Sequence, residues 1–206
     1  MKTLDSILDN SLYERMANSF NQAGSDKESD HSYVNAYIYL FNKYNISIDS
    51  DINFLEIGIA NRTPEFSSLH AWADIFSNAK IYGLDIDAGK MINDNPRIST
   101  YVANQSSIID LSRFRQDSEY VKFDVILDDG SHVFSDAAFS FEYLLKSLKS
   151  GGLYMIEDVS KRSPSWEQTV EEWEIYLSLN NDVEFEIIDT KPGVTDDSIV
   201  IGVHKL

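Results

Sequence analysis

The residues best suited to chemistry follow a short apolar run in the second half of the chain. Segment 128–132 reads Asp-Asp-Gly-Ser-His directly after the run 123–127. This run predicts a buried strand, so Asp128 and Asp129 should emerge at its end, where Gly130 permits a sharp turn. A neutral imidazole beside carboxylates can act as a general base near neutral pH, which makes His132 a candidate base. The same residues also fit a helix-capping turn with a surface histidine.

A second acidic pair, Glu157-Asp158, ends the next apolar run, 153–156. If the two predicted strands are neighbours, these carboxylates face the same crevice as Asp129. Neither acidic segment contains lysine or arginine, and like charges brought together in a crevice repel one another. A divalent cation with oxygen ligands is the simplest remedy. A shared proton, or compensation by the nearby Lys161-Arg162, remains open.

The composition limits which metal such a site could bind. The chain has no cysteine, so disulfides, thiolate metal sites and a cysteine nucleophile are excluded. Any metal must be held by oxygen or imidazole ligands, which favours Mg²⁺, Ca²⁺ or Mn²⁺ over structural zinc.

The charge of the chain limits its partners. It carries 34 acidic against 17 basic residues, a formal net charge of −17. Such a field repels nucleic-acid phosphates and anionic lipids and suits a cationic ligand or a metal. The sequence shows no apolar run long enough to span a bilayer and no signal-peptide pattern, so we expect a cytoplasmic protein.

From residue 49 onward, short apolar runs alternate with helical patterns. Strands are predicted at 53–58, 79–85, 97–102, 123–128, 153–157, 183–188 and 198–203. Helices are predicted at 66–76, 106–120, 134–148 and 165–179, the third closed by Gly151-Gly152 as a C-cap. The last two strands flank Lys191-Pro192-Gly193 as a hairpin. The pattern predicts an α/β fold, with a mostly parallel seven-stranded sheet, helices on both faces and a C-terminal antiparallel hairpin.

The first 48 residues have a different texture. A helix is predicted from the spacing of apolar residues, and it should close near Ala23-Gly24. Those apolar residues are Leu4, Ile7, Leu8, Leu12 and Met16. An aromatic helix follows, in which Tyr33, Tyr37 and Tyr44 either line an acceptor pocket or belong to the core or a dimer contact. Trp166 and Trp173 are equally ambiguous. We expect a single domain, 1–206, with a helical cap at 1–48 and the α/β core at 49–206.

In an open α/β sheet, ligands bind beyond the carboxyl ends of the strands. Nearly every predicted strand ends in an acid or an amide, namely Glu56, Asp85, Asn104-Gln105, Asp128 and Glu157. A nicotinamide dinucleotide needs a glycine-rich turn for its pyrophosphate, yet Gly58 is followed by Ala60 and Arg62 where further glycines would be expected. S-adenosylmethionine has a sulfonium and an ammonium and no phosphate. The acidic strand ends therefore favour S-adenosylmethionine, although Asp85 suits the ribose of either ligand.

These segments together carry a family resemblance. Segments 54–58, 68–72 and 78–87 look like the cofactor half of Rossmann-like class I S-adenosylmethionine-dependent methyltransferases. Segments 128–132 and 151–158 are similar to metal-dependent sugar O-methyltransferases of the macrocin and mycinamicin type and to related enzymes of bacterial polysaccharide clusters. Gly24-Ser25-Asp26-Lys27, with His31 and Tyr33, also resembles the N-terminal signature of that group. The resemblance extends from about Gly24 to about Asp158.

The resemblance implies specific roles for these residues. Asp129, Glu157 and Asp158 would ligate Mg²⁺, and His132 would be the base. The contacts with S-adenosylmethionine would come from Glu56, Gly58, Asp85, Gln105 and Asp128. The implied reaction is metal-dependent O-methylation of a sugar or another vicinal hydroxyl.

The acceptor is less closely defined than the reaction. It would be a small molecule or a saccharide. The macrolide enzymes carry a larger N-terminal part than this chain, which leaves the acceptor and a possible homo-oligomer open. A catechol-type methyltransferase and a non-catalytic ligand-binding protein are the alternatives.

Overall fold

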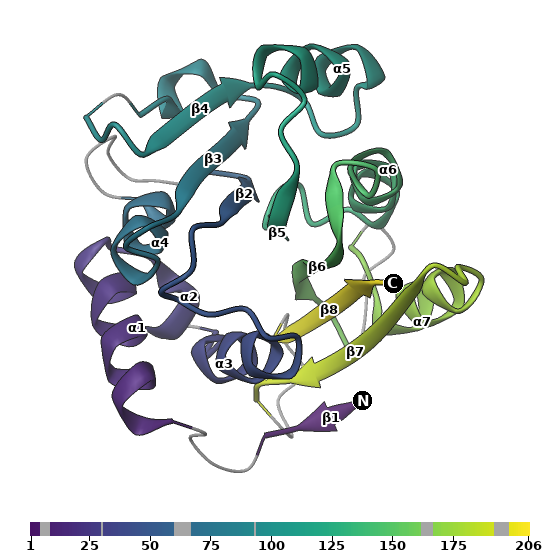
Figure 1. Cartoon of the computed structure of the whole chain (residues 1–206). Helices are drawn as coiled ribbons and strands as arrows, with labels where there is room; N and C mark the ends of the chain where they lie inside the picture. Colours follow the sequence, from purple (N-terminus) through teal and green to yellow (C-terminus); the bar gives the residue numbers. More distant parts are fainter. Residues whose placement is uncertain (5–8, 30, 60–66, 93, 162–166, 192–197) are drawn as a thin grey trace.

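The computed structural model describes residues 1–4, 9–29, 31–59, 67–92, 94–161, 167–191 and 198–206. Within these ranges the chain forms an eight-stranded sheet (Figure 1). In spatial order its strands are β1 (Lys2–Thr3), β7 (Val183–Asp189), β8 (Ile199–Lys205), β6 (Leu148–Val159), β5 (Phe123–Asp128), β2 (Asn53–Ile57), β3 (Lys80–Asp85) and β4 (Ile98–Val102).

Strand pairing confirms the predicted fold class. β8 pairs antiparallel with β6 and β7, and the other neighbouring strands pair in parallel. The strand count is eight where seven were predicted. The additional strand is β1, whose two residues pair with Ile188 and Asp189 of β7. So short a strand has no periodicity from which it could be predicted.

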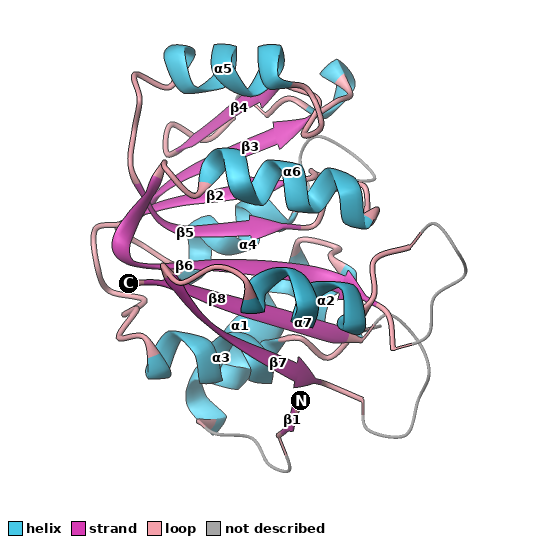
Figure 2. Ribbon diagram, turned by 90° about the vertical axis from the view of Figure 1, so that its right-hand side faces the viewer, coloured by secondary structure: helices cyan, strands magenta, loops and turns pink. Residues whose placement is uncertain are grey.

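Helices cover both faces of the sheet (Figure 2). On one face lie α1 (Asn10–Gln22), α3 (Val34–Lys43) and α4 (Ser68–Ile75), and on the other α5 (Ile108–Asp117), α6 (Phe134–Leu144) and α7 (Val170–Ser178). Alternate strand residues enter two separate cores: Phe54 and Val125 pack with the first set of helices, Leu55 and Ile126 with the second. This two-sided burial is why the strands read as continuous apolar runs.

The first helix begins later than its apolar spacing predicted. Asp9 caps it by accepting a hydrogen bond from the backbone N–H of Leu12 at 3.0 Å, and Leu4 lies outside it. Its end agrees with the prediction, because Gly24 follows with a φ of 67°. After a single helical turn, α2 (Asp26–Ser29), the chain enters α3.

The prediction that Gly151-Gly152 caps a helix is wrong. Helix α6 ends at Leu144, and both glycines lie within β6. The pairing of β6 with β5 shifts register here, from Phe123↔Leu148 to Val125↔Leu153. Gly151 has a φ of 78°, so the glycines form a bulge in the strand rather than a helix end.

The remaining helices are shorter than predicted, α4, α5 and α7 each by several residues. Pro192-Gly193 of the expected hairpin turn and Trp166 lie outside the described residues. Trp173, on α7, is fully buried in the core and therefore does not line an acceptor pocket. No helix among the described residues has both the length and the apolar character needed to cross a membrane.

Candidate active site

The predicted site residues converge because their strands are neighbours. β5 lies between β2 and β6, and all three run in parallel. Their carboxyl ends therefore meet at one edge of the sheet. This brings Glu56, Asp129 and Glu157 together with Lys27, which reaches the same place from α2.

Two glycines allow the loops at this edge to approach each other closely. Gly58 has a φ of 89°, and a Cβ atom there would lie 2.0 Å from the carbonyl oxygen of Asp129. A Cβ at Gly130 would lie 1.9 Å from Oε1 of Gln105. At these two positions the loops after β2, β4 and β5 therefore lie so close together that no side chain larger than that of glycine could fit.

A pocket of about 280 Å³ opens beside these loops. It is lined by Ile57, Gly58, Leu84, Asp85, Ile86, Ala103, Asn104, Gln105, Ser106, Gly130, Ser131 and Asp136. The predicted cofactor residues Gly58, Asp85 and Gln105 are among them. The Asp85 carboxylate is held in place by the backbone N–H groups of Ile59 and Asp87, each at 2.8 Å. It can still accept further hydrogen bonds, such as those of a ribose diol.

Glu56 and Asp128 do not line this pocket but lie buried behind it. Ser68 donates to Glu56 at 2.7 Å, and burial raises the pKa of Glu56 to about 7. The carboxylate of Asp128 accepts hydrogen bonds from Gln105, Ser140 and Tyr154. Burial also raises the pKa of Asp128. Asp128 thus holds Gln105, which lines the pocket, whereas the partners of Glu56, Ser68 and Lys27, do not line it.

The prediction from sequence missed part of the lining. Asn104, Ser106, Ser131 and Asp136 all face the pocket. Asn104 is one of the amides predicted at a strand end, but the cofactor contact was assigned to its neighbour Gln105 alone. Asp136 lies in the first turn of α6, where acids commonly stabilise a helix N-terminus, so its type and position gave no sign of a pocket role.

Asp129, His132 and Asp158 form a compact cluster next to the pocket. Nε2 of His132 lies 3.3 Å from Oδ1 of Asp129 and 3.1 Å from Oδ2 of Asp158. One candidate ligand atom from each residue lies within 4.8 Å of the other two. His132 and Asp158 have φ values of 58° and 52°. This left-handed conformation is strained for residues other than glycine, and such strain occurs most often at functional sites.

Gln168 holds the backbone of both strained residues. Its backbone N–H donates to the carbonyl of His132 at 3.1 Å, and its side-chain amide donates to the carbonyls of Glu157 at 2.6 Å and Asp158 at 3.2 Å. Trp173 in turn donates to Oε1 of Gln168 at 3.2 Å. These contacts fix the direction in which the cluster faces.

Burial and neighbouring charges shift the pKa values of all three residues of the cluster. Burial opposes a charge on His132, but the hydrogen bond with Asp129 and the charges of Asp158 and Asp129 outweigh it and raise the pKa of His132 to about 9. Burial likewise opposes ionisation of Asp129, but Lys27 and His132 lower its pKa to about 2. Burial and the charge of Asp129 raise the pKa of Asp158. Without a further cation, the imidazole therefore holds a proton.

Glu157, the third predicted metal ligand, lies deeper than the other two. Its Oε2 is 2.5 Å from Nζ of Lys27, and the hydroxyl of Tyr37 donates to Oε1. Lys27 is only 2% exposed. It supplies a positive charge that was not predicted from the sequence, although it closes the segment Gly24–Lys27 that resembles the family. Lys161, the predicted source of compensating charge, pairs instead with Asp189 at 2.8 Å, and Arg162 lies outside the described residues.

The aromatic residues before and within α3 are part of the core, yet two of their hydroxyls reach the site. Tyr33 donates to Oδ1 of Asp158 at 2.6 Å, and Tyr37 to Glu157, while both rings are buried. His31 stacks on Tyr33 with ring centroids 5.0 Å apart. Tyr44 stacks on His204 at 4.3 Å, in a contact with a different part of the sheet.

The donor set fits a hard divalent cation. Carboxylate oxygens from Asp129 and Asp158 and an imidazole nitrogen face one small volume. Such ligands suit Mg²⁺ or Mn²⁺, and the described residues contain no thiolate, as the chain has no cysteine.

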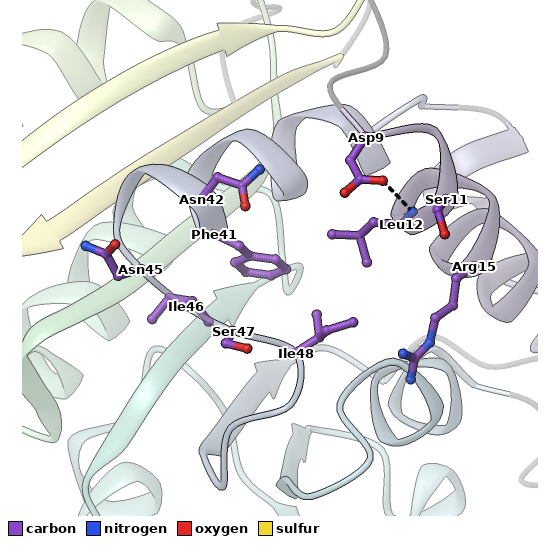
Figure 3. A pocket seen from close by; sticks show the side chains of 10 residues that line it. All are labelled: Asp9, Ser11, Leu12, Arg15, Phe41, Asn42, Asn45, Ile46, Ser47 and Ile48. Carbon is purple, nitrogen blue, oxygen red and sulfur yellow. Dashed lines mark hydrogen bonds between the residues drawn. The ribbon is translucent and has the colours of Figure 1, made fainter.

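A larger hollow of about 570 Å³ lies elsewhere, between the start of α1 and the segment that follows α3 (Figure 3). Its charged groups already have structural partners. Asp9 caps α1, and Arg15 donates to the carbonyls of Asp74 and Ile75 at 3.0 and 2.9 Å. Its segment 46–48 precedes β2, at the amino end of that strand, opposite the edge where ligands bind in such sheets. We therefore place the site at the smaller pocket.

Comparison of sequences identifies relatives that are named as O-methyltransferases. No protein-family model matches the chain. It is 34% identical over 140 residues to 8-demethyl-8-alpha-L-rhamnosyl tetracenomycin-C 2'-O-methyltransferase of Streptomyces olivaceus, covering 66% of this chain and 35% of the relative. It is 37% identical over 114 residues to demethylmacrocin O-methyltransferase of Streptomyces fradiae, covering 54% of this chain and 28% of the relative. The chain therefore matches about a third of these relatives' length.

Comparison of structures gives the same class. The mycinamycin-pathway methyltransferase MycE, solved with Mg and SAH, superposes with a TM-score of 0.69 at 25% identity, over 93% of this chain and 54% of MycE. An O-methyltransferase from Bacillus cereus, 16% identical, superposes with a TM-score of 0.60 over 98% of this chain and 94% of that one.

The fold is thus that of the class I S-adenosylmethionine-dependent methyltransferases, as the sequence predicted. Within that class, the predicted similarity to the sugar O-methyltransferases of the macrocin and mycinamicin type is confirmed.

Proposed function

We propose that this chain is an S-adenosylmethionine- and Mg²⁺-dependent O-methyltransferase that methylates a hydroxyl of a sugar, either free or attached to a small molecule or saccharide. One observation carries the proposal. The segment after β5 serves two sites at once, because Gly130 and Ser131 line the pocket while Asp129 and His132 belong to the adjacent cluster. A methyl donor and a metal-oriented hydroxyl would therefore meet across a single turn.

The names of the relatives support the proposed O-methyltransferase activity. One relative is named as a 2'-O-methyltransferase of a rhamnosyl tetracenomycin and another as an O-methyltransferase of demethylmacrocin, and MycE was solved with Mg and SAH. We propose the cytoplasm as its location. The absence of nucleic-acid and membrane partners and a possible homo-oligomer remain predictions from the sequence.

The pocket residues would bind and orient the cofactor. Asp85 would accept hydrogen bonds from the ribose hydroxyls, since its carboxylate is fixed by two backbone N–H groups. Gln105 would face the cofactor with an amide that is itself held by Asp128 and by Ser131. Gly58 would allow the ligand to approach the backbone. Asp128 would keep Gln105 in place. For Glu56, the cofactor contact stays a prediction from the sequence.

Asp129 and Asp158 would hold the metal. Glu157, the third predicted ligand, has its two oxygens on Lys27 and Tyr37 in this structure, and we propose that it acts on the metal site through Lys27 instead of ligating the ion. When bound, S-adenosylmethionine supplies an electrophilic methyl group and Mg²⁺ lowers the pKa of an acceptor hydroxyl. His132 would accept the hydroxyl proton at Nε2, the atom that faces Asp129 and Asp158. The ring becomes available as a base once the charges of these two carboxylates, which hold its proton, are neutralised.

The test is to measure binding and turnover separately. Calorimetry should show binding of S-adenosylhomocysteine, and methyl transfer from S-adenosylmethionine to rhamnosyl or other glycoside acceptors should require Mg²⁺ and stop with EDTA. His132→Ala should keep S-adenosylhomocysteine affinity while losing turnover by about 100-fold or more, the usual contribution of a general base.

Two outcomes would contradict the proposal. Undiminished turnover by His132→Ala would remove the base assignment. Transfer to catechols but to no sugar would replace the acceptor class with the catechol alternative. A suitable control is Lys149→Met, since Lys149 is an exposed residue paired with Asp124; it should leave both binding and turnover unchanged.

A further inference from the structure

Lys27 occupies an unusual place for a lysine. Its side chain is 2% exposed, and it comes from the single helical turn α2 that links the two N-terminal helices. Nζ lies 2.5 Å from Oε2 of Glu157, 2.7 Å from Oδ2 of Asp129 and 3.2 Å from Oε1 of Glu56. A buried ammonium is stable only with such partners, so its position is tightly determined.

The two oxygens of Asp129 face opposite ways and divide the acidic crevice. Oδ2 faces Lys27, together with Glu56 and Glu157, and we call this the inner half. Oδ1 faces His132, together with Asp158, and we call this the outer half. The inner half already holds a positive charge that belongs to the chain. In the outer half, Asp158 meets the imidazoles of His132 at 3.1 Å and His31 at 3.7 Å and the hydroxyl of Tyr33, none of which carries a permanent positive charge.

We propose that Lys27 is a resident cation: it fills the inner half permanently, so that the crevice takes a single exchangeable divalent ion, on the side of Asp129 that faces Asp158. Lys27 is then a positioning residue for the reaction. With one ammonium it holds both Glu56, at the end of β2, and Asp129, at the proposed metal site. This inference rests on the proposed function for the role of the divalent ion.

The proposal has a consequence that a purely structural lysine would not have. Removing the ammonium leaves the carboxylates of Glu56, Asp129 and Glu157 together without a cation, and like charges in one buried place cannot all stay ionised. A small cation with oxygen ligands can then replace the ammonium. Lys27→Met should therefore bind an additional metal ion instead of simply losing metal affinity.

The experiment counts bound Mn²⁺ by electron paramagnetic resonance and calorimetry, without cofactor. Wild type should bind one Mn²⁺ per chain and Lys27→Met two, and Mn²⁺ should raise the melting temperature of Lys27→Met more than that of wild type. Lys27→Arg keeps the charge and should bind one. The double variant Lys27→Met/Glu157→Gln loses one carboxylate together with the ammonium, so no uncompensated negative charge is left. It should again bind one Mn²⁺ per chain. Lys149→Met, which removes an exposed lysine, should behave as wild type.

Other outcomes overturn the inference. If Lys27→Met folds and binds one Mn²⁺ with unchanged affinity, or stays unfolded even in Mn²⁺, a metal does not replace the ammonium and the inference is wrong. The proposed function is tested independently. A wild type that binds neither Mn²⁺ nor S-adenosylhomocysteine contradicts the function, whereas one that methylates normally while Lys27→Met gains no ion contradicts only the role of Lys27.

Discussion

At the scale of single residues, the site is governed by how charges are paired. Lys27 and His132 contribute positive charge from opposite sides of Asp129. This explains how acids from three strands can share one edge of the sheet in the absence of a metal. It also sets the protonation of the candidate base, since the same carboxylates that would hold a metal hold the proton on His132.

The pKa of His132 yields a pH prediction for the metal-free protein. Its pKa in the folded state is about 9, above the ordinary value of 6.5. A raised pKa means that the protonated ring stabilises the fold, fully below about pH 6.5, and that this contribution is lost as the pH rises through about 9. The stability difference between wild type and His132→Asn should shrink over that window in urea unfolding.

The titration can also be observed directly. The chain has 4 histidines, so the imidazole signals can be assigned by NMR from single substitutions. The His132 signal should titrate near pH 9 without metal and at lower pH with Mg²⁺, because a cation on Asp129 and Asp158 weakens their hold on the proton. A His132 pKa near 6.5 in the metal-free protein would contradict this account.

At the scale of elements, the site depends on loops that approach each other more closely than side chains allow. Gly58→Ala would place a Cβ 2.0 Å from the Asp129 carbonyl, in a backbone with a φ of 89°. We expect a loss of about 3 kcal/mol or more in unfolding free energy, from overpacking plus backbone strain. Binding of S-adenosylhomocysteine should be lost as well, because the loops after β2 and β5 must separate.

Gly151→Ala provides the matched control. Gly151 has a φ of 78°, but a Cβ there would meet nothing within 4 Å. This variant should lose only about 1 kcal/mol, from backbone strain alone, and keep its cofactor affinity. Equal losses for the two variants in urea unfolding would mean that close packing at Gly58 is not the cause.

Most of the element order could be predicted from the sequence, because the periodicity that identifies strands and helices is a local property. The strands that carry Glu56, Asp85, Asp128 and Glu157 all form as expected. The bulge at Gly151-Gly152 could not be distinguished from a helix cap, since glycine favours both and the choice depends on pairing with β5. The two-residue β1 also depends on a distant partner, β7.

The candidate site was predicted less completely, for a related reason. Strand ends identify residues that meet at one edge, and this is how Asp129, His132 and Asp158 were found. The contact of Lys27 with Glu157 spans 130 positions in sequence and depends on how α2 packs over the sheet. No spacing rule contains that information. The deeper position of Glu157 relative to Asp158 has the same origin.

At the scale of the whole molecule, the net charge of −17 has a measurable effect. Self-repulsion disfavours the compact state, and added salt screens it. Raising NaCl from about 0.01 M to about 0.15 M shortens the Debye length from about 30 Å to about 8 Å. The melting temperature should therefore rise with NaCl, by roughly 2–4 °C for each kcal/mol of repulsion relieved.

A second salt separates screening from specific binding. Tetramethylammonium chloride at the same ionic strength should give the same rise, because its cation is too large for the acidic crevice. A rise with NaCl alone would indicate a bound Na⁺ instead of screening, and a falling melting temperature in both salts would contradict the prediction.

The position of Lys27 also bears on the order of events in the life of the protein. Where a metal supplies the charge that holds acidic ligands together, the chain cannot fold until the metal arrives, as in small zinc domains. Here the ammonium between Glu56, Asp129 and Glu157 is made with the polypeptide. We therefore expect this chain to fold without a metal. The folded protein would gain activity only when the proposed metal ion binds.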